Sequence, residues 1–216
     1  MSLSPNKKRL PIVTIIGGPS GGGKSTVARH LARRSRSTVI HLDDLRLALM
    51  KNQSVATDPG IADVLSYFET TPGVWSLSHE FHQSAFVRIG EILAPSIEAI
   101  VLNHLVTSEP IHIEGDSVLP SFFDRPQLIA ALAGGQLSVV YVVPESPGTI
   151  RKNLDTRGWG GPHVSDAQKD AMVLAKSSFG RWLQDEASIR GFPVVQPLPY
   201  STLIDRIERI TEVRES

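Results

Sequence analysis

Cysteine is absent from this sequence of 216 residues. Its absence excludes a disulfide framework, a thiol nucleophile and a cysteine-based zinc site. The sequence also lacks any apolar run near the roughly 18 residues that a transmembrane helix requires, and its first residues lack the apolar core of a signal peptide. We therefore expect no membrane partner.

An excess of charge of one sign is missing as well. The 22 Lys and Arg residues are balanced by 22 Asp and Glu residues, so the composition gives no bulk attraction to nucleic acid or to an anionic surface. We expect no nucleic-acid partner. Apolar residues make up 41% of the chain, as is usual for a globular protein, and the length suits a single α/β domain.

The most informative motif that is present lies at residues 18–25. These residues spell G-P-S-G-G-G-K-S and match the phosphate-binding P-loop, G-x-x-x-x-G-K-S. An apolar run at 12–16 precedes the motif, and a helix-forming run at 26–34 follows it. Glycines let such a loop curl so that its N–H groups, at a helix N-terminus, point at a phosphate. The motif predicts binding of a nucleoside triphosphate, which suits a cytoplasmic enzyme.

The P-loop pattern also assigns roles to single residues. Lys24 would reach the β- and γ-phosphates, and the Ser25 hydroxyl would take one coordination position on Mg²⁺. We expect Lys24 to lie on a solvated loop, so that Lys24→Ala would abolish turnover without unfolding the protein. ATP and Mg²⁺ are the expected cofactors. The residues expected to bind the nucleotide are Gly18, Pro19, Ser20, Gly21, Gly22, Gly23, Lys24, Ser25 and Thr26.

Strand-like and helix-like segments alternate along the chain. This order predicts an α/β fold in which helices cover both faces of a mostly parallel five-stranded sheet, the three-layer arrangement of P-loop NTPases, with a helical lid. The expected strands are 12–16, 38–42, 111–113, 137–143 and 192–196. The expected helices are 26–34, 44–51, 78–106, 126–133, 149–156, 166–189 and 201–213. Asp44 should cap its helix, and Pro95 should kink or split the long one.

Acidic residues follow two of the expected strands. Asp43 and Asp44 come after the second strand, and Glu114 and Asp116 after the third. Ligands of open parallel sheets bind beyond the carboxyl ends of the strands, where an acid can hold Mg²⁺ or accept the proton of an attacking hydroxyl. We expect Asp43 or Asp44 to be catalytic, and Ser25, Glu114 and Asp116 to bind the metal. The alternatives are a helix cap for the aspartate pair, a buried hydrogen-bonded carboxylate for Glu114 and a turn residue for Asp116.

Two arginines bracket an expected helix beside a glycine-rich loop, within the segment at about residues 146–165 that we expect to form the lid. Phosphoryl transfer requires cations on several sides of the moving group, and a closing loop can bring them in and exclude water. We therefore expect Arg151 and Arg157 to be catalytic. The alternative for each is a solvated helix charge.

Together these residues resemble the P-loop kinases of small molecules, in the nucleoside monophosphate kinase-like superfamily, and most of all the 2-phosphoglycerate kinase-like proteins. The resemblance rests on residues 18–26, on His41-Leu42-Asp43-Asp44 with Arg46 following, and on the stretch from 75 to 122 that contains Ile113-Glu114-Gly115-Asp116. It implies transfer of the γ-phosphate of ATP to a hydroxyl of a small molecule, with or without a phosphate of its own. It also implies an adenine site at the loop that contains Pro199.

The resemblance further implies one P-loop kinase domain over 1–216, as a monomer or homodimer, with a helical substrate-binding region at about 52–106. The chain departs from the family at Gly115-Asp116-Ser117, which is more polar than expected after Glu-Gly and favours a different acceptor. Arg46 and Arg88 are the candidates for binding an anionic acceptor.

Three other functions use similar machinery. A regulatory NTPase would hydrolyse nucleotide to drive a partner, but the N-K-x-D or T-K-x-D motif of GTP specificity does not occur. A toxin-like or antibiotic-modifying kinase would differ only in its acceptor pocket. A nucleic-acid kinase is disfavoured by the balanced charge.

Overall fold

The computed structural model describes residues 10–56, 58–158 and 164–212. Its centre is a five-stranded sheet of order β2-β3-β1-β4-β5. All four neighbouring strand pairs are parallel, which confirms the predicted fold class. The strands are β1 (Val13–Gly17), β2 (Thr38–His41), β3 (Ile111–Gly115), β4 (Leu137–Val142) and β5 (Val194–Val195).

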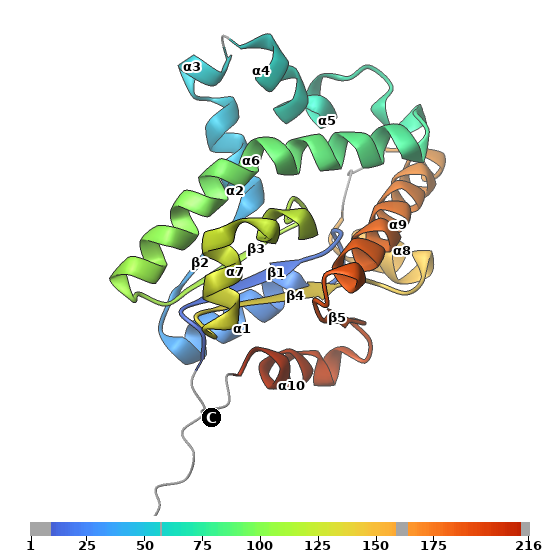
Figure 1. Cartoon of the computed structure of the whole chain (residues 1–216). Helices are drawn as coiled ribbons and strands as arrows, with labels where there is room; N and C mark the ends of the chain where they lie inside the picture. Colours follow the sequence, from blue (N-terminus) through green and yellow to red (C-terminus); the bar gives the residue numbers. More distant parts are fainter. Residues whose placement is uncertain (1–9, 57, 159–163, 213–216) are drawn as a thin grey trace, which may run out of the picture.

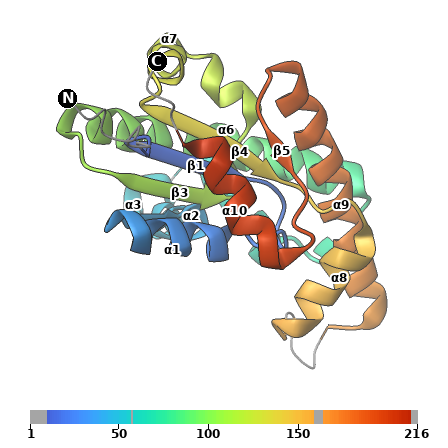
Figure 2. The same ribbon diagram turned by 90° about the horizontal axis from the view of Figure 1, so that it is seen from below.

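Helices cover both faces of this sheet (Figure 1, Figure 2). Ten α-helices and two 3₁₀ helices are described. The α-helices are α1 (Lys24–Ser35), α2 (Leu42–Met50), α3 (Gln53–Ala56), α4 (Pro59–Leu65), α5 (Tyr67–Thr70), α6 (His79–Thr107), α7 (Pro126–Ala133), α8 (Pro147–Thr156), α9 (Asp166–Ile189) and α10 (Tyr200–Thr211). The 3₁₀ helices are η1 (Val74–Ser76) and η2 (Pro120–Asp124).

Two hydrophobic cores form because successive strand side chains point to opposite faces. In β1, Ile15 joins the core beneath α6, α7 and α9, whereas Ile16 joins the core beneath α1 and α10. Tyr141 and Val142 of β4 divide in the same way. Because both faces of these strands are covered, they are apolar almost throughout, as parallel strands usually are.

The helix after β2 begins earlier than expected. It starts at Leu42 with His41 at the N-cap position, and no side chain caps it. The prediction that Asp44 caps this helix is therefore wrong, and Asp43 and Asp44 both lie in its first turn. An acid there interacts favourably with the helix dipole but is not required to begin the helix.

The long helix α6 remains a single helix through Pro95. Figure 1 shows it changing direction along its length, as a proline that removes one backbone hydrogen bond requires. Further along α6, Gly90 lies against Leu119, in the segment that follows β3; a Cβ at Gly90 would be 2.6 Å from Leu119 Cγ. This close approach positions α6 over the end of β3.

The segment between α2 and α6 is more helical than its turn residues indicate. Asp58 caps α4 by accepting a hydrogen bond from the Gly60 amide, and Phe68 and Trp75 stack with ring centroids 5.5 Å apart. The short helices α3, α4, α5 and η1 form a layer beside α6 (Figure 1). Of these, α5 and η1 provide one wall of the site described below.

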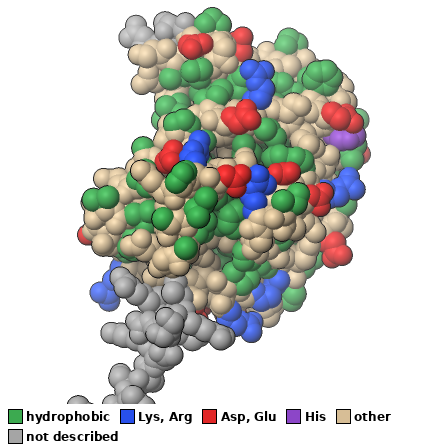
Figure 3. Space-filling view, viewed as in Figure 1, with side chains coloured by type: hydrophobic (Ala, Val, Ile, Leu, Met, Phe, Trp, Pro, Cys, Tyr) green, Lys and Arg blue, Asp and Glu red, His purple; other side chains and the backbone are tan. Residues whose placement is uncertain are grey.

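Acidic and basic side chains are interspersed on the face shown in Figure 3. Among the described helices, none combines the length and the apolar character needed to cross a bilayer.

Gly90→Ala should destabilise the protein by about 1–3 kcal/mol, because the added methyl group overpacks the contact with Leu119. Gly148→Ala is the matched control. It lies in the first turn of α8, where a Cβ meets only Ser146 Oγ at 3.8 Å, so the better helix propensity of alanine should add about 0.5 kcal/mol of stability. Urea unfolding measures both changes, and equal effects would contradict the account of this contact.

Candidate active site

The P-loop connects β1 to α1 through backbone conformations that glycine adopts readily. Gly18, Gly21 and Gly23 have φ values of 128°, 90° and 90°. A Cβ at Gly18 would lie 2.1 Å from the carbonyl oxygen of Val142, so only glycine fits between the two backbones. Gly23 is the N-cap residue of α1. The loop therefore curls around the N-terminus of a helix, a geometry that suits an anion.

The Lys24 ammonium group is buried and bound to Asp116. Its Nζ lies 2.9 Å from Asp116 Oδ1 and donates to the Pro19 carbonyl oxygen at 3.0 Å. The second oxygen, Asp116 Oδ2, accepts from the Ser20 amide at 3.1 Å and from the Ser20 hydroxyl at 2.5 Å. The expectation that Lys24 lies on a solvated loop is wrong, since the residue is only 5% exposed. Asp116 thus accepts hydrogen bonds from groups that, in the P-loop pattern, bind phosphate.

The Glu114 carboxylate lies next to this pair and connects two other residues of the site. Ser25 Oγ donates to Glu114 Oε1 at 2.8 Å, and His41 Nδ1 lies 2.5 Å from the same oxygen. Glu114 is the last but one residue of β3 and pairs in register with His41 of β2. His41, the last residue of β2, therefore lies at the site through its contact with Glu114.

A narrow cavity of about 50 Å³ lies beside the P-loop. We call it the phosphate pocket. It brings together most of the side chains that the sequence analysis singled out as catalytic or metal-binding. Its lining residues are Ser20, Gly21, Gly23, Lys24, Ser25, Asp43, Glu114, Gly115, Asp116 and Arg157.

A wider cavity of about 350 Å³ adjoins the phosphate pocket, and we call it the acceptor pocket. Ser20, Asp43 and Asp116 line both cavities. The other lining residues come from α2, α5, η1, α6 and α9 and from the segment that follows β3. They are Arg46, Leu47, Phe68, Glu69, Trp75, Phe86, Ile89, Ser117, Met172 and Lys176.

The two carboxylates on the shared wall have pKa values shifted in opposite directions. Desolvation by the surrounding protein raises the pKa of Asp43, although part of its side chain faces solvent, and the negative charge of Asp116 raises it further. Burial alone would raise the pKa of Asp116 too, but Lys24, Lys176 and Ser20 outweigh this and hold the pKa well below its usual range. Such a divergence between neighbouring acids is typical of sites that need one base and one permanent charge.

Lys176 was not found from the sequence. Its Nζ lies 3.7 Å from Asp116 Oδ2 and 5.5 Å from the centre of the Phe86 ring. Burial lowers its pKa, while Asp116 opposes that shift. A signal was present, because Lys176 occupies the apolar stripe of α9 with Met172 and Phe179, at spacings of four and three residues. A charge on such a stripe requires a buried partner.

The lid arginines differ in position. Arg157, which we expected to be catalytic, lines the phosphate pocket. Arg151 instead forms ion pairs with Asp155, Asp166 and Asp170 at 3.1, 2.7 and 2.5 Å, and it lines neither pocket. In this structure Arg151 ties α8 to α9. Residues 159–163 of the expected lid lie outside the described part of the chain.

A third cavity of about 260 Å³ lies on the other side of the P-loop, between α1, α8 and α10. Asn153 Nδ2 donates to the carbonyl oxygen of Gly21 and to Tyr200 Oη in its wall. Pro199, expected at the adenine, is the N-cap residue of α10 and directly precedes Tyr200. Tyr200 rather than Pro199 lines the cavity. Asp44 lines none of these three cavities.

Asp116→Asn should lower the free energy of unfolding by about 3 kcal/mol, because two buried ammonium groups lose their shared counter-ion. Asp124→Asn is the matched control. Asp124 is 57% exposed in its ion pair with Arg190, so its loss should cost less than about 1 kcal/mol.

The same variant tests the pH dependence of stability. Because folding lowers the pKa of Asp116, its contribution is complete above the ordinary aspartate pKa of about 3.9 and is lost as the pH falls towards the folded value. Wild type should show this loss in urea unfolding between pH 5 and pH 2 (approximate limits), whereas Asp116→Asn should lack that component. Parallel pH profiles would contradict the ion-pair assignment.

Comparison with known proteins agrees with this geometry. The family model described as an AAA domain matches residues 13–89, which run from β1 into α6. A 2-phosphoglycerate kinase of Methanocaldococcus jannaschii is 28% identical over 210 residues, covering 94% of this chain and 64% of that protein. The chain therefore spans about two thirds of the length of this relative.

Solved structures of kinases resemble the chain more weakly. A gluconokinase from Sinorhizobium meliloti has a TM-score of 0.49 at 19% identity, covering 94% of this chain and 95% of its own. A shikimate kinase from Acinetobacter baumannii has a TM-score of 0.40 at 13% identity, covering 93% and 90%. The resemblance predicted from the P-loop, the aspartate pair and the Glu-Gly segment is confirmed: the chain matches the AAA-domain model over residues 13–89 and is distantly similar to a 2-phosphoglycerate kinase.

Proposed function

We propose that this protein is an ATP-dependent phosphotransferase that moves the γ-phosphate to a hydroxyl of a small molecule. The observation that carries the proposal is the wall of Ser20, Asp43 and Asp116 shared by the phosphate and acceptor pockets. A γ-phosphate held by Lys24 and a hydroxyl in the acceptor pocket would meet at this wall. Such positioning supplies much of the acceleration in phosphoryl transfer.

Asp43 is the proposed general base. It borders both pockets, and its raised pKa makes it a better proton acceptor than an ordinary aspartate. Asp116 is a poorer base because Lys24 and Ser20 occupy both of its oxygens. Asp44 lines neither pocket. This division of roles selects Asp43 from the two aspartates expected to be catalytic, and leaves Asp116, expected to bind the metal, paired with Lys24.

Ser25 and Glu114 are the residues that would hold Mg²⁺. Their oxygens lie 2.8 Å apart in the phosphate pocket, and hard oxygen donors of this kind fit the ion. No cluster of three or more metal-binding side chains occurs among the residues described. That agrees with an ion that takes one or two protein oxygens and otherwise phosphates and water. Bound there, Mg²⁺ would neutralise charge on the β- and γ-phosphates.

The remaining parts of the chain have proposed roles around this centre. Arg157 would be a second cation at the phosphates, and the cavity lined by Tyr200 would receive the nucleoside. A phosphate role for Arg151 stays a prediction, because its three ion pairs would first have to break. The helical region at 52–106 contributes Phe68, Glu69, Trp75, Phe86 and Ile89 to the acceptor pocket, which supports its proposed part in substrate binding.

Lys24→Met should lower kcat at least about a hundredfold, because a positioned cation on the transferred phosphate is lost. Methionine keeps much of the side-chain volume, and thermal melting measured beside turnover separates loss of fold from loss of chemistry. Lys51→Met, at an exposed lysine, should leave both unchanged. Full turnover by a folded Lys24→Met protein would contradict the P-loop assignment.

Asp43→Asn should reduce kcat by about 10²–10⁴, the usual contribution of a general base. Asp44→Asn is the matched control, because it removes the same charge from the same helix turn. At neutral pH Asp43→Asn should melt no lower than Asp44→Asn, because folding raises the pKa of Asp43 and its ionised form therefore costs stability. Only Asp43→Asn should lose turnover in an assay of ADP release. Equal losses of activity would contradict the assignment of the base.

A further inference from the structure

The acceptor pocket contains more carboxylates than cations. Asp43, Glu69 and Asp116 supply three carboxylates, whereas Arg46 and Lys176 are its two cations. This excess of carboxylates matters because an anionic ligand loses much of its hydration on entering a pocket. The pocket must supply positive charge to compensate for that loss.

Arg46 is already bound to Glu69. The two side chains form a bidentate pair, with Nη2 2.7 Å from Oε1 and Nη1 3.1 Å from Oε2. Nη1 also donates to the carbonyl oxygen of Leu65. Bidentate pairs are among the stronger polar contacts in proteins. Arg46, one of the two arginines expected to bind an anionic acceptor, is therefore not available to a ligand.

Lys176 is engaged in a similar way. It faces Asp116 at 3.7 Å and the ring of Phe86, and burial lowers its pKa. Asp116 is also the ion-pair partner of Lys24. An anion in the acceptor pocket would have to compete with this buried carboxylate for both ammonium groups.

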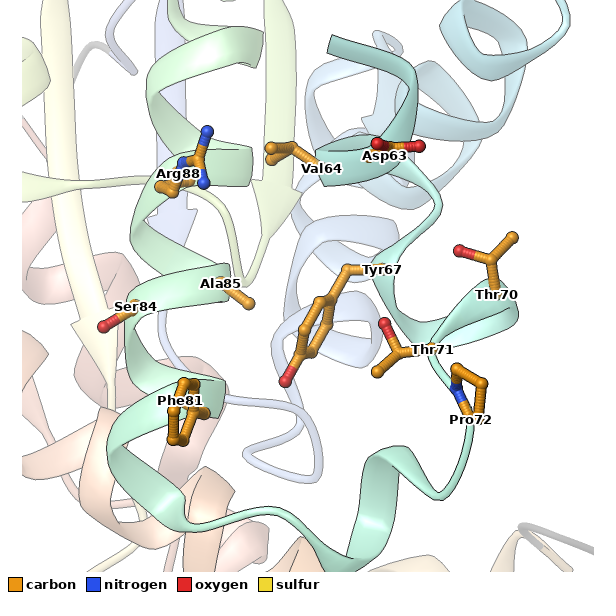
Figure 4. A pocket seen from close by; sticks show the side chains of 10 residues that line it. All are labelled: Asp63, Val64, Tyr67, Thr70, Thr71, Pro72, Phe81, Ser84, Ala85 and Arg88. Carbon is orange, nitrogen blue, oxygen red and sulfur yellow. The ribbon is translucent and has the colours of Figure 1, made fainter. Parts of the chain in front are cut away.

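Arg88, the other arginine expected at an anionic acceptor, lies in a different cavity. Figure 4 shows it on α6 across from Asp63 and Val64, with Tyr67 and Phe81 further along the same space. This cavity of about 460 Å³ shares no lining residue with the acceptor pocket. Arg88 therefore supplies no charge to the site of transfer.

The apolar wall of the acceptor pocket contains three aromatic rings beside the aliphatic side chains Leu47, Ile89 and Met172. Phe68 stacks on Trp75 with centroids 5.5 Å apart, and its ring centroid lies 5.0 Å from that of Phe86. Aromatic faces pack against the C–H surface of a ligand, while ionised carboxylates only accept hydrogen bonds, as hydroxyl groups require. The volume of about 350 Å³ is at the small end of ligand pockets.

We propose that the phosphate acceptor is an uncharged polyhydroxy compound, a sugar or cyclitol without a phosphate group, and not a phosphorylated hydroxy acid. This rests on the proposed kinase function. In the transfer, the acceptor hydroxyl oxygen bonds to the γ-phosphorus of ATP while the bond from that phosphorus to the β–γ bridging oxygen breaks. The hydroxyl proton passes to Asp43, and ADP leaves with the bridging oxygen.

The test measures ADP release from MgATP with two sets of acceptors and with none. One set holds uncharged sugars and cyclitols, including glucose and myo-inositol; the other holds their monophosphates and 2- and 3-phosphoglycerate. We expect release that depends on a member of the uncharged set and none above background with the phosphorylated set. Calorimetric binding of the same compounds, with a non-hydrolysable ATP analogue present, measures preference independently of turnover.

Glu69→Gln provides a second test, because it removes the carboxylate charge that pairs with Arg46 and keeps Arg46 itself. The variant should raise kcat/KM for a phosphorylated acceptor at least about tenfold, as one newly available charged contact allows. Glu91→Gln, at an exposed glutamate on α6 outside the pocket, is the matched control and should change nothing.

The outcomes distinguish failure of the inference about the acceptor from failure of the proposed kinase function. Preferential turnover or tighter binding of 2-phosphoglycerate by wild type would overturn the inference and leave the kinase proposal standing. ADP release at one rate with and without every acceptor would overturn the kinase proposal, and the inference with it. Binding and turnover of an uncharged polyol alone would support both.

Discussion

The buried contact between Lys24 and Asp116 is the interaction on which the rest of the site depends. The parallel register pairs Gly17 of β1 with Gly115 of β3, so the P-loop and Asp116 leave the sheet at the same edge. A buried ammonium or carboxylate group without its partner costs several kcal/mol. The contact therefore fixes the P-loop against the end of β3, and Lys176 brings α9 to the same point.

The same contact determines how the site would respond to nucleotide. Asp116 occupies Lys24 and the Ser20 amide and hydroxyl, the kind of donors that phosphate oxygens would use. The phosphates of a bound triphosphate would take the place of the Asp116 carboxylate at Lys24 and Ser20. Asp116 would then keep Lys176 as its partner. Asp43, with its raised pKa, would then remain on the wall between the two pockets as the proposed proton acceptor. Asp116 on this wall pairs with Lys176, and Glu69 pairs with Arg46, so both cations of the acceptor pocket already have an acidic partner.

Much of the fold followed from local patterns, and the errors came where long-range contacts decide. Apolar runs and the glycine loop predicted β1, α1 and the sheet. The positions of Asp43, Glu114 and Asp116 at strand ends predicted that they share one site, because parallel strands bring their carboxyl ends together. The start of α2 was missed, since no capping side chain marks it. The buried state of Lys24 and the position of Lys176 were missed because each depends on Asp116, distant in sequence. The pairing of Arg151 with carboxylates on α9 could not be read from spacing along one helix.

Following the γ-phosphate itself tests the central claim most directly. The protein would be given ATP labelled at the γ-phosphorus, with Mg²⁺ and a pool of uncharged polyhydroxy compounds, and the labelled products separated. The account predicts that label passes into an acid-stable phosphate ester, and only when the pool is present. Label found solely as inorganic phosphate, at the same rate with and without the pool, would contradict it.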